Sequence, residues 1–401
     1  MSPADRRIVE LDLLRAALVI GQVFFHSARV FSLDAFYVSN GVRSLGLSFV
    51  VAFAVLWGMP LLFLISGQTA WMSLATHGCV RFVRERVLRL LVPFAFGLLF
   101  LVPPQVYLLL RGDASYHGGY LAFLQRFFRV VPALDWPWLV RADPRTALFE
   151  ASHLYFLYFL FSYSVLLVGV RALARGGCPP LVHRVLSAWW RPSMVLWLGL
   201  PVGAVEAWLG SENYGGWNRY AFLAFFLLGA WLAISPSLRL NMGRHLTVAL
   251  ALAVPLTALG FWVYAQAALA GEYLGHGAAP LNRSWRLLKG LCAWWWVLVF
   301  YNAALHLRLG QGGRDGLASR RWQAIAAYWR EAALPFYLLH HPIVIALAYP
   351  IVRLECGVLT KWVTLSLAAL LATLGTYEVL VRRVPPLRFL LGMRTGERQS
   401  G

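Results

Sequence analysis

The chain has 401 residues, of which 60% are apolar or aromatic and only 13% are charged. Soluble domains carry about 25% charged and about 45–50% apolar residues, so this composition argues against a water-soluble enzyme and against a disordered chain. The formal charge of +19 is almost entirely due to arginine, because Lys289 and Lys361 are the only lysines. These arginines lie between long apolar runs, which favours a membrane protein over a nucleic-acid-binding protein.

Ten apolar segments approach the length of about 20 residues that a membrane-spanning helix needs. They cover residues 11–32, 47–74, 88–110, 152–171, 193–209, 217–235, 245–269, 285–306, 332–352 and 360–381. The first is too long for the apolar region of a signal peptide and ends without a small-residue cleavage site. The sequence therefore predicts an all-α polytopic membrane protein, with about ten transmembrane helices around an intramembrane cavity. We expect one domain over residues 1–401, with 382–401 as a short basic cytoplasmic tail.

The distribution of arginine predicts the orientation. Arginines gather in the loops on the side of the N-terminus, and the opposite side has fewer. Because cytoplasmic loops are enriched in Arg and Lys, both termini are expected in the cytoplasm, in a multi-pass protein of a bacterial inner (plasma) membrane. The long loop over residues 111–151 would then face outward, either on the membrane surface or as a cap on a cavity.

The first predicted span contains three ionisable residues: Asp12, Arg15 and His26. Such groups are costly inside a membrane, so each is a candidate functional residue. Arg15 and His26 are eleven residues apart, which on a helix places them on nearly the same face and roughly 16 Å apart along the axis. Asp12 is one turn from Arg15 and is expected to pair with it. This pattern suits an anionic ligand that enters from the cytoplasm, although a snorkelling arginine and a structural histidine would also explain it.

A cluster of arginines precedes the third span, in the sequence RFVRERVLRLLVPF. It contains Arg81, Arg84, Arg86 and Arg89, and the last two share a helix face. Arginine is well suited to bidentate contacts with phosphate, so this cluster is a candidate polyphosphate site. A short basic cytoplasmic loop would have the same composition for topological reasons alone.

Other polar residues are weaker candidates. His340 and His341 lie between Pro335 and Pro342, which are expected to interrupt the ninth span and free backbone groups around a cavity. His153 opens the fourth span at the outer interface, where packing among aromatic side chains is an alternative explanation.

Small and acidic residues have structural explanations. Ser66, a candidate supporting residue, and Gly67 form part of a segment typical of close helix packing, and Glu206 and Glu378 lie near helix ends where snorkelling would explain them. The cysteines are scattered and predict no metal site.

Taken together and in order, these segments resemble the acyltransferase-3 family of integral membrane acyltransferases. The resemblance covers nearly the whole chain. It includes an Arg followed after ten residues by His (Arg15 and His26) and the basic pair Arg86 and Arg89 before a Leu/Pro stretch. The other segments are FLISG at 63–67, HLYFL at 153–157, FLLGA at 226–230 and LPFYLLHHP at 334–342. HLYFL has Tyr where the family has Trp, and His341 stands where the family often has Gln. The branch that it most resembles is the glucan-biosynthesis protein C type.

The resemblance implies an O-acyltransferase that moves an acyl group from cytoplasmic acyl-CoA to a hydroxyl of a sugar or glycan outside the cytoplasm. Acyl-CoA would be the donor substrate, with no bound cofactor and no metal. Arg15, Arg86 and Arg89 would hold its phosphates, and His26 would act as general base or as an acyl relay. His153, His340 and Ser66 would support the acceptor side. Expected partners are the glycan or other hydroxyl acceptor, the lipid bilayer and glycan-synthesis proteins, without nucleic acid.

Two other interpretations stay open on the sequence alone. A transporter or flippase for glycans or lipid-linked sugars would also have many spans and buried ionisable groups, but the paired half-repeats typical of transporters are not evident. In a membrane-bound O-acyltransferase of the other known family, His340 would be catalytic instead of His26. The early Arg-to-His pattern argues against that assignment.

Overall fold

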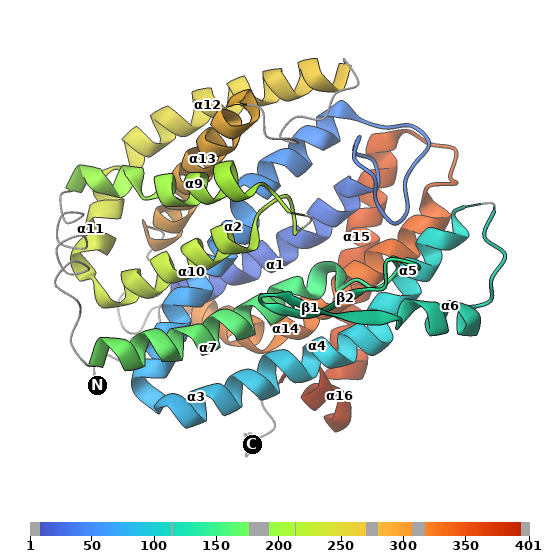
Figure 1. Ribbon diagram of the computed structural model, residues 1–401, viewed down its shortest axis with the longest axis horizontal. Coiled ribbons are helices and arrows are strands. Elements are labelled where there is room, and N and C mark those ends of the chain that lie inside the picture. The colour runs from blue at the N-terminus through green and yellow to red at the C-terminus, as the bar shows by residue number, and fades with distance from the viewer. Residues whose placement is uncertain are drawn as a thin grey trace. The chain divides into compact units, whose positions relative to one another are not determined.

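The computed structural model describes residues 9–113, 115–175, 192–212, 214–269, 280–306 and 317–393 (Figure 1). Eight helical segments within these ranges are long and apolar enough to cross a membrane. They are Val9–Arg29, Leu45–His77, Cys79–Arg111, Ser152–Leu173, Leu246–Ala267, Asn282–His306, Arg320–Ile351 and Val358–Val381. The other two predicted spans are shorter apolar helical segments, Ser193–Leu209 and Arg219–Ile234. The predicted all-α polytopic class is confirmed.

The third spanning segment changes its helical form at its prolines. It consists of α3 (Cys79–Arg86), a π-helical turn (Val87–Leu91), α4 (Val92–Phe96), a second π-helical turn (Gly97–Leu101) and α5 (Val102–Arg111). Pro93 and Pro103 have no N–H to donate to the preceding turn. Just before each of them, Val92 and Val102 donate instead to carbonyls five residues back. The helix therefore widens at each proline without ending.

The chain divides into two compact units, and five helices contribute residues to both: α1 (Val9–Arg29), α2 (Leu45–His77), α3, α7 (Tyr155–Arg175) and α14 (Leu317–Ile351). The first unit contains the described residues of 1–15, 52–83 and 163–326. Besides parts of those five helices it holds a short 3-10 segment (Pro192–Trp197) and five complete helices. These are α9 (Gly199–Leu209), α10 (Arg219–Ile234), α11 (Pro236–Arg244), α12 (Leu246–Leu269) and α13 (Pro280–His306).

Glycines set the closest helix crossings of the first unit. A Cβ atom on Gly67 of α2 would overlap the Phe226 carbonyl of α10, and a Cβ on Gly229 of α10 would overlap the Leu64 carbonyl of α2. Gly203 of α9 and Gly290 of α13 meet in the same way, backbone against backbone. The prediction that FLISG forms a close helix contact is thus confirmed for Gly67, as expected where small residues allow helices to approach.

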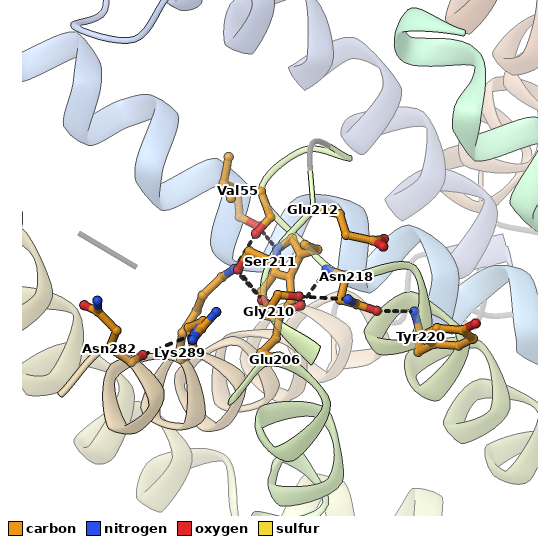
Figure 2. A network of polar contacts seen from close by, with 12 residues as sticks. Val55, Glu206, Gly210, Ser211, Glu212, Asn218, Tyr220, Asn282 and Lys289 are labelled. Atoms are coloured by element: carbon orange, nitrogen blue, oxygen red, sulfur yellow. Dashed lines mark hydrogen bonds and ion pairs between the residues drawn. The ribbon is translucent and has the colours of Figure 1, made fainter. Parts of the chain in front are cut away.

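A polar network joins α9, α13 and the loop before α10 (Figure 2). Glu206 is fully buried, and its carboxylate accepts hydrogen bonds from Ser211 Oγ (2.7 Å), the Asn218 backbone N–H (2.5 Å) and Lys289 Nζ (3.0 Å). The Lys289 ammonium also donates to the Gly216 carbonyl and lies 4.0 Å from the centre of the Trp217 ring. The expectation that Glu206 snorkels to the surface is therefore wrong, because donors from two other segments satisfy its carboxylate inside the protein.

The second unit contains the described residues of 16–51, 84–162 and 327–401. It adds helices α6 (Tyr120–Phe127), α15 (Val358–Thr376) and α16 (Pro385–Leu390), and a π-helical turn at Tyr377–Val381. Strands β1 (Val130–Asp135) and β2 (Trp138–Ala142) form a short antiparallel hairpin in the long loop, with Val131 opposite Arg141. Of the predicted basic tail, residues 382–393 include α16, and residues 394–401 lie outside the described part of the chain.

Helix α14 is continuous through Pro335, Pro342 and Pro350. The expected interruption around the two histidines is therefore wrong. A proline removes one donor from the helix, and the carbonyl four residues before it loses its usual partner. For Pro342 this carbonyl belongs to Leu338, which accepts a hydrogen bond from another segment at the histidine cluster.

Candidate functional site

Four histidines gather within the second unit. His26 comes from α1, His153 from the 3-10 turn Ser152–Leu154, and His340 and His341 from α14. The His26 and His341 rings are perpendicular with centres 4.3 Å apart, the His153 and His341 rings stack at 4.5 Å, and the His26 and His340 centres are 5.3 Å apart. The structure therefore brings three predicted site residues, His26, His153 and His340, into one cluster. His341 is its fourth member.

Gln105 fixes the tautomer of His341. The Gln105 amide donates from Nε2 to the Leu101 carbonyl at 2.6 Å, so its Oε1 faces His341 and accepts from Nδ1, also at 2.6 Å. In the neutral ring the proton is then on Nδ1, and His341 Nε2 carries the lone pair. Sequence analysis missed Gln105, although a single amide in the apolar stretch LVPPQVYLLL was a visible signal.

His153 uses the carbonyl that Pro342 leaves without a helical partner. His153 Nε2 lies 3.3 Å from the Leu338 oxygen, and since a carbonyl only accepts, Nε2 carries the proton. The Tyr337 hydroxyl in turn donates to the His153 backbone carbonyl. The expectation that the prolines free backbone groups is thus confirmed at Leu338, whose carbonyl bonds to His153 instead of to its own helix. The helix itself is not broken.

His340 is fully buried, and a hydrogen bond at one of its two ring nitrogens holds the ring. Its Nδ1 lies 2.6 Å from the Tyr337 carbonyl, so this nitrogen is the protonated one in the neutral ring. His26 is only half-buried, and its ring packs edge-on against Phe25 at 4.8 Å and parallel to Phe36 at 6.1 Å. Three of the four rings therefore have their proton position fixed by an oxygen acceptor. The fourth, His26, is the one that the sequence pattern singled out.

A row of hydroxyl and carboxyl groups leads away from the cluster. Ser152 Oγ lies 3.5 Å from both Gln105 Oε1 and His153 Nδ1, and the Tyr37 hydroxyl lies 2.9 Å from Ser152 Oγ and contacts Glu150. Burial and the Glu150 charge raise the pKa of the Tyr37 phenol well above its usual value, so it remains a donor at neutral pH. Burial also raises the pKa of the Glu150 carboxyl, and the bond from Tyr37 offsets part of this rise.

Ser152 has an unusual backbone conformation. Its φ of 49° lies in the left-handed region, which few residues other than glycine adopt. Such conformations cost of order 1–3 kcal/mol and are found most often at functional sites. The surrounding structure holds Ser152 in place, which directs its hydroxyl between Gln105 and His153.

Arg15 lies on α1 like His26, in the part of the helix that belongs to the first unit. Its guanidinium pairs with Asp12 at 3.2 Å, which confirms the expected partner, and lies 3.5 Å from Thr69 Oγ1 of α2. Ser66 is also in α2 within the first unit and is buried. The histidine cluster does not include Ser66.

Arg86 and Arg89 belong to the second unit, as the histidines do. Arg86 ends α3, Arg89 lies in the π-helical turn that follows, and both are half-buried. Sixteen residues separate Arg89 from Gln105 along the same helical segment, which corresponds to about 24 Å at the usual helical rise. The other two arginines of the motif, Arg81 and Arg84, are exposed.

The histidine cluster is not arranged as a metal site. Within the described ranges, no group of three or more His, Cys, Asp or Glu side chains is placed to hold a metal ion. Three of the rings instead direct an N–H at a carbonyl or amide oxygen. The arrangement is suited to proton transfer or to attack by a ring nitrogen.

Comparison with known proteins identifies the family of the chain. A family model described as an acyltransferase domain (acyltransferase-3) matches residues 8–380. Among curated proteins, the chain is similar to glucans biosynthesis protein C of Escherichia coli O157:H7 (strain EC4115 / EHEC) and of Escherichia coli (strain K12). In both cases 24% of 410 aligned positions are identical, covering 97% of this chain and 94% of the relative. No solved structure matches the chain. With its apolar helices and a family match over nearly its whole length, the chain belongs to the acyltransferase-3 family and is an integral membrane acyltransferase.

Proposed function

We propose that the protein transfers an acyl group from cytoplasmic acyl-CoA to a hydroxyl of a sugar or glycan outside the cytoplasm. The observation that carries this proposal is the position of His26 among three histidines whose proton positions are fixed. A glucan acceptor is consistent with the similarity of the chain to glucans biosynthesis protein C. We further propose that the protein resides in a bacterial inner membrane with both termini in the cytoplasm.

His26 would act as the general base. It removes the proton from the acceptor hydroxyl as the oxygen attacks the thioester carbonyl, so that a C–O bond forms and the C–S bond breaks. The same proton then passes from His26 to the leaving thiolate of CoA, and no proton is gained or lost overall. A neutral imidazole is suited to both steps because its pKa lies near physiological pH in water. Attack by His26 on the thioester, followed by transfer of the acyl group, would use the same ring nitrogen.

Arg86 and Arg89 would bind the phosphates of CoA. Both are half-buried, they are three residues apart in the sequence, and they belong to the same unit as the histidines. The planar guanidinium group donates two parallel hydrogen bonds to a phosphate. Arg15, the third arginine expected in the donor site, belongs to the first unit, where Asp12 is its partner.

The test is acyl transfer by purified protein in nanodiscs. Labelled acetyl-CoA and succinyl-CoA serve as donors and a glucan oligosaccharide serves as acceptor, with release of CoA thiol measured in parallel. Because a general base contributes roughly 10²- to 10⁴-fold to a rate, His26→Ala should lower kcat by at least about a hundredfold. His117→Ala, which changes an exposed histidine of the outer loop, is the matched control and should leave kcat unchanged. Full transfer by His26→Ala would remove His26 from the mechanism.

A further inference from the structure

Two buried ring nitrogens in the cluster are without partners. His26 Nδ1 and His340 Nε2 are both inaccessible to solvent, and neither has a hydrogen bond within the described part of the chain. Leaving a buried polar atom unsatisfied costs about 1–3 kcal/mol, so each such atom needs an explanation. The two nitrogens belong to neighbouring rings, whose centres are 5.3 Å apart.

The two nitrogens are also chemically complementary. His340 Nδ1 faces the Tyr337 carbonyl and must donate to it, so His340 Nε2 is an acceptor in the neutral ring. A neutral His26 carries one proton and can place it on either nitrogen. If the proton is on Nδ1, His26 supplies the donor that His340 lacks.

The distance between the rings permits this bond. A ring nitrogen lies roughly 1 Å from its ring centre, so two facing nitrogens at this separation would be roughly 3 Å apart, a normal donor–acceptor distance. The planes of the two rings differ by 45°, and only a turn of one ring is needed. His340 is held by Tyr337, whereas no hydrogen bond holds Nδ1 of His26, so His26 is the ring that turns.

We propose that His340 is the positioning residue of His26, accepting a hydrogen bond from His26 Nδ1–H at its own Nε2. This inference rests on the proposed function, since it assigns the second nitrogen of His26 to the reaction. The bond leaves the lone pair of His26 on Nε2, which then takes the proton of the acceptor hydroxyl. When His26 becomes an imidazolium, His340 Nε2 still accepts its Nδ1–H and stabilises the charge. Catalytic triads use a carboxylate for the same purpose; here the acceptor is a neutral imidazole held by a backbone carbonyl.

Two amide variants test the roles of the two ring nitrogens of His340 one at a time. In His340→Asn, the side-chain amide N–H takes the place of Nδ1 and keeps the bond to the Tyr337 carbonyl, but no acceptor remains near His26. In His340→Gln, the amide oxygen reaches the place of Nε2 and restores an acceptor. We expect kcat to fall roughly 10- to 100-fold in His340→Asn with KM for acyl-CoA unchanged, the range expected for losing a hydrogen bond to a charged group. His340→Gln should recover most of this loss.

A purely structural role for His340 would give a different result. Both variants would then lower thermal stability, and Gln, which gives up the bond to Tyr337, would be at least as harmful as Asn. Full activity of His340→Asn, or failure of Gln to exceed Asn in kcat, overturns the inference. Full activity of His26→Ala in the same assay would instead overturn the proposed function, so the two failures are distinguishable.

A measurement on the unmodified protein covers the case in which the Asn variant fails to fold. In protein labelled with ¹⁵N-histidine, the His26 signals are assigned by their loss in His26→Ala. The ring of His26 should carry its proton on Nδ1. Observation of the Nε2–H form would contradict the proposed bond, whatever the variants show.

Discussion

Glu206 remains buried because three donors from two other segments surround its carboxylate. Two come from the loop that follows α9, the Ser211 hydroxyl and the Asn218 backbone, and the third is the Lys289 ammonium of α13 (Figure 2). In a buried pair the Coulombic gain mainly compensates for the loss of water, so the pair adds little net stability. Removing one partner is costly all the same, because the other charge stays buried.

Lys289 supplies the positive charge of this buried pair. Lys289→Met leaves the Glu206 carboxylate with two hydrogen-bond donors and without its lysine counter-charge, and should lower the free energy of unfolding by about 3–5 kcal/mol. Adding Glu206→Gln to this variant removes the buried charge and should recover part of the loss. Thermal unfolding of the detergent-solubilised protein measures both.

The control is an ion pair at the surface. Arg382 and Glu378 form a salt bridge of 3.0 Å between side chains that are 50% and 40% exposed. Exposed pairs contribute about 0–1 kcal/mol, so Arg382→Met should have little effect. Equal losses in Lys289→Met and Arg382→Met would contradict the structural role of the buried pair.

Individual site residues could be predicted only where their chemistry is unusual for a membrane span. His26, His153 and His340 stand out in this way, and the structure brings them together. Gln105 was missed, although a single amide in an apolar stretch is visible, because it belongs to no spacing motif. Tyr37 was missed because a phenol in an aromatic stretch is common. Their importance depends on which segments meet in space, and the one-dimensional pattern does not contain that information.

At the scale of elements, Pro342 shows how a proline can serve a site without breaking its helix. Helix α14 continues past it, and the Leu338 carbonyl accepts from His153 in place of the missing N–H. The sequence correctly indicated freed backbone groups near the two histidines. It could not indicate that a side chain from another segment would satisfy the Leu338 carbonyl while the helix continues through the proline.

A prediction for the packing of helices concerns two glycines of α2. A Cβ on Gly67 would overlap the backbone carbonyl of Phe226, whereas a Cβ on Gly58 would meet nothing within 4 Å. Because the obstacle is backbone, α2 and α10 would have to separate, and overpacking typically costs about 1–3 kcal/mol or more. Gly67→Ala should therefore lower the melting temperature and the yield of folded protein.

Gly58→Ala is the matched control for this prediction, since it adds the same methyl group to the same helix. It should leave stability unchanged or raise it slightly, because alanine favours the helix more than glycine does. A stable Gly67→Ala protein would show that α2 and α10 are not in backbone contact.

At the scale of the whole molecule, one helical segment of the second unit connects the proposed donor site to the histidine cluster. Arg89 lies near the beginning of Cys79–Arg111, and Gln105, which orients His341, lies near its end. Sixteen residues of helix separate them by about 24 Å. In the proposed function, CoA phosphates bind at one end of this segment and the acyl group reaches the other.

The corresponding prediction separates donor binding from chemistry. Arg89→Ala should raise KM for acyl-CoA by roughly tenfold or more, since hydrogen bonds to charged groups are worth about 1.5–3 kcal/mol, with a smaller effect on kcat. Steady-state kinetics in nanodiscs with varied acetyl-CoA measures both constants. Arg84→Ala, at an exposed arginine of the same motif, is the control. An unchanged KM in Arg89→Ala would refute the phosphate role.

The sequence alone was sufficient to predict the all-α membrane class and the approximate position of each long span, because hydropathy over about 20 residues is a direct consequence of bilayer thickness. It could not predict the hairpin of β1 and β2 within the long loop over residues 111–151. That loop has no membrane constraint, and its conformation depends on tertiary contacts such as the stacking of Trp138 on Tyr158 at 4.6 Å.

The short helices α9 and α10 have a consequence for the surrounding lipid. At 1.5 Å per residue, the 16 residues of α10 rise about 24 Å, less than the hydrocarbon thickness of about 30 Å. A hairpin of this length creates a hydrophobic mismatch, which bilayers relieve by thinning. To the extent that the bilayer does not thin, the connection that contains Ser211 and Asn218 would lie below the level of the headgroups, where little water reaches unsatisfied backbone groups. The polar network around Glu206 and Lys289 gives the Asn218 N–H and the Gly216 carbonyl partners that do not depend on water.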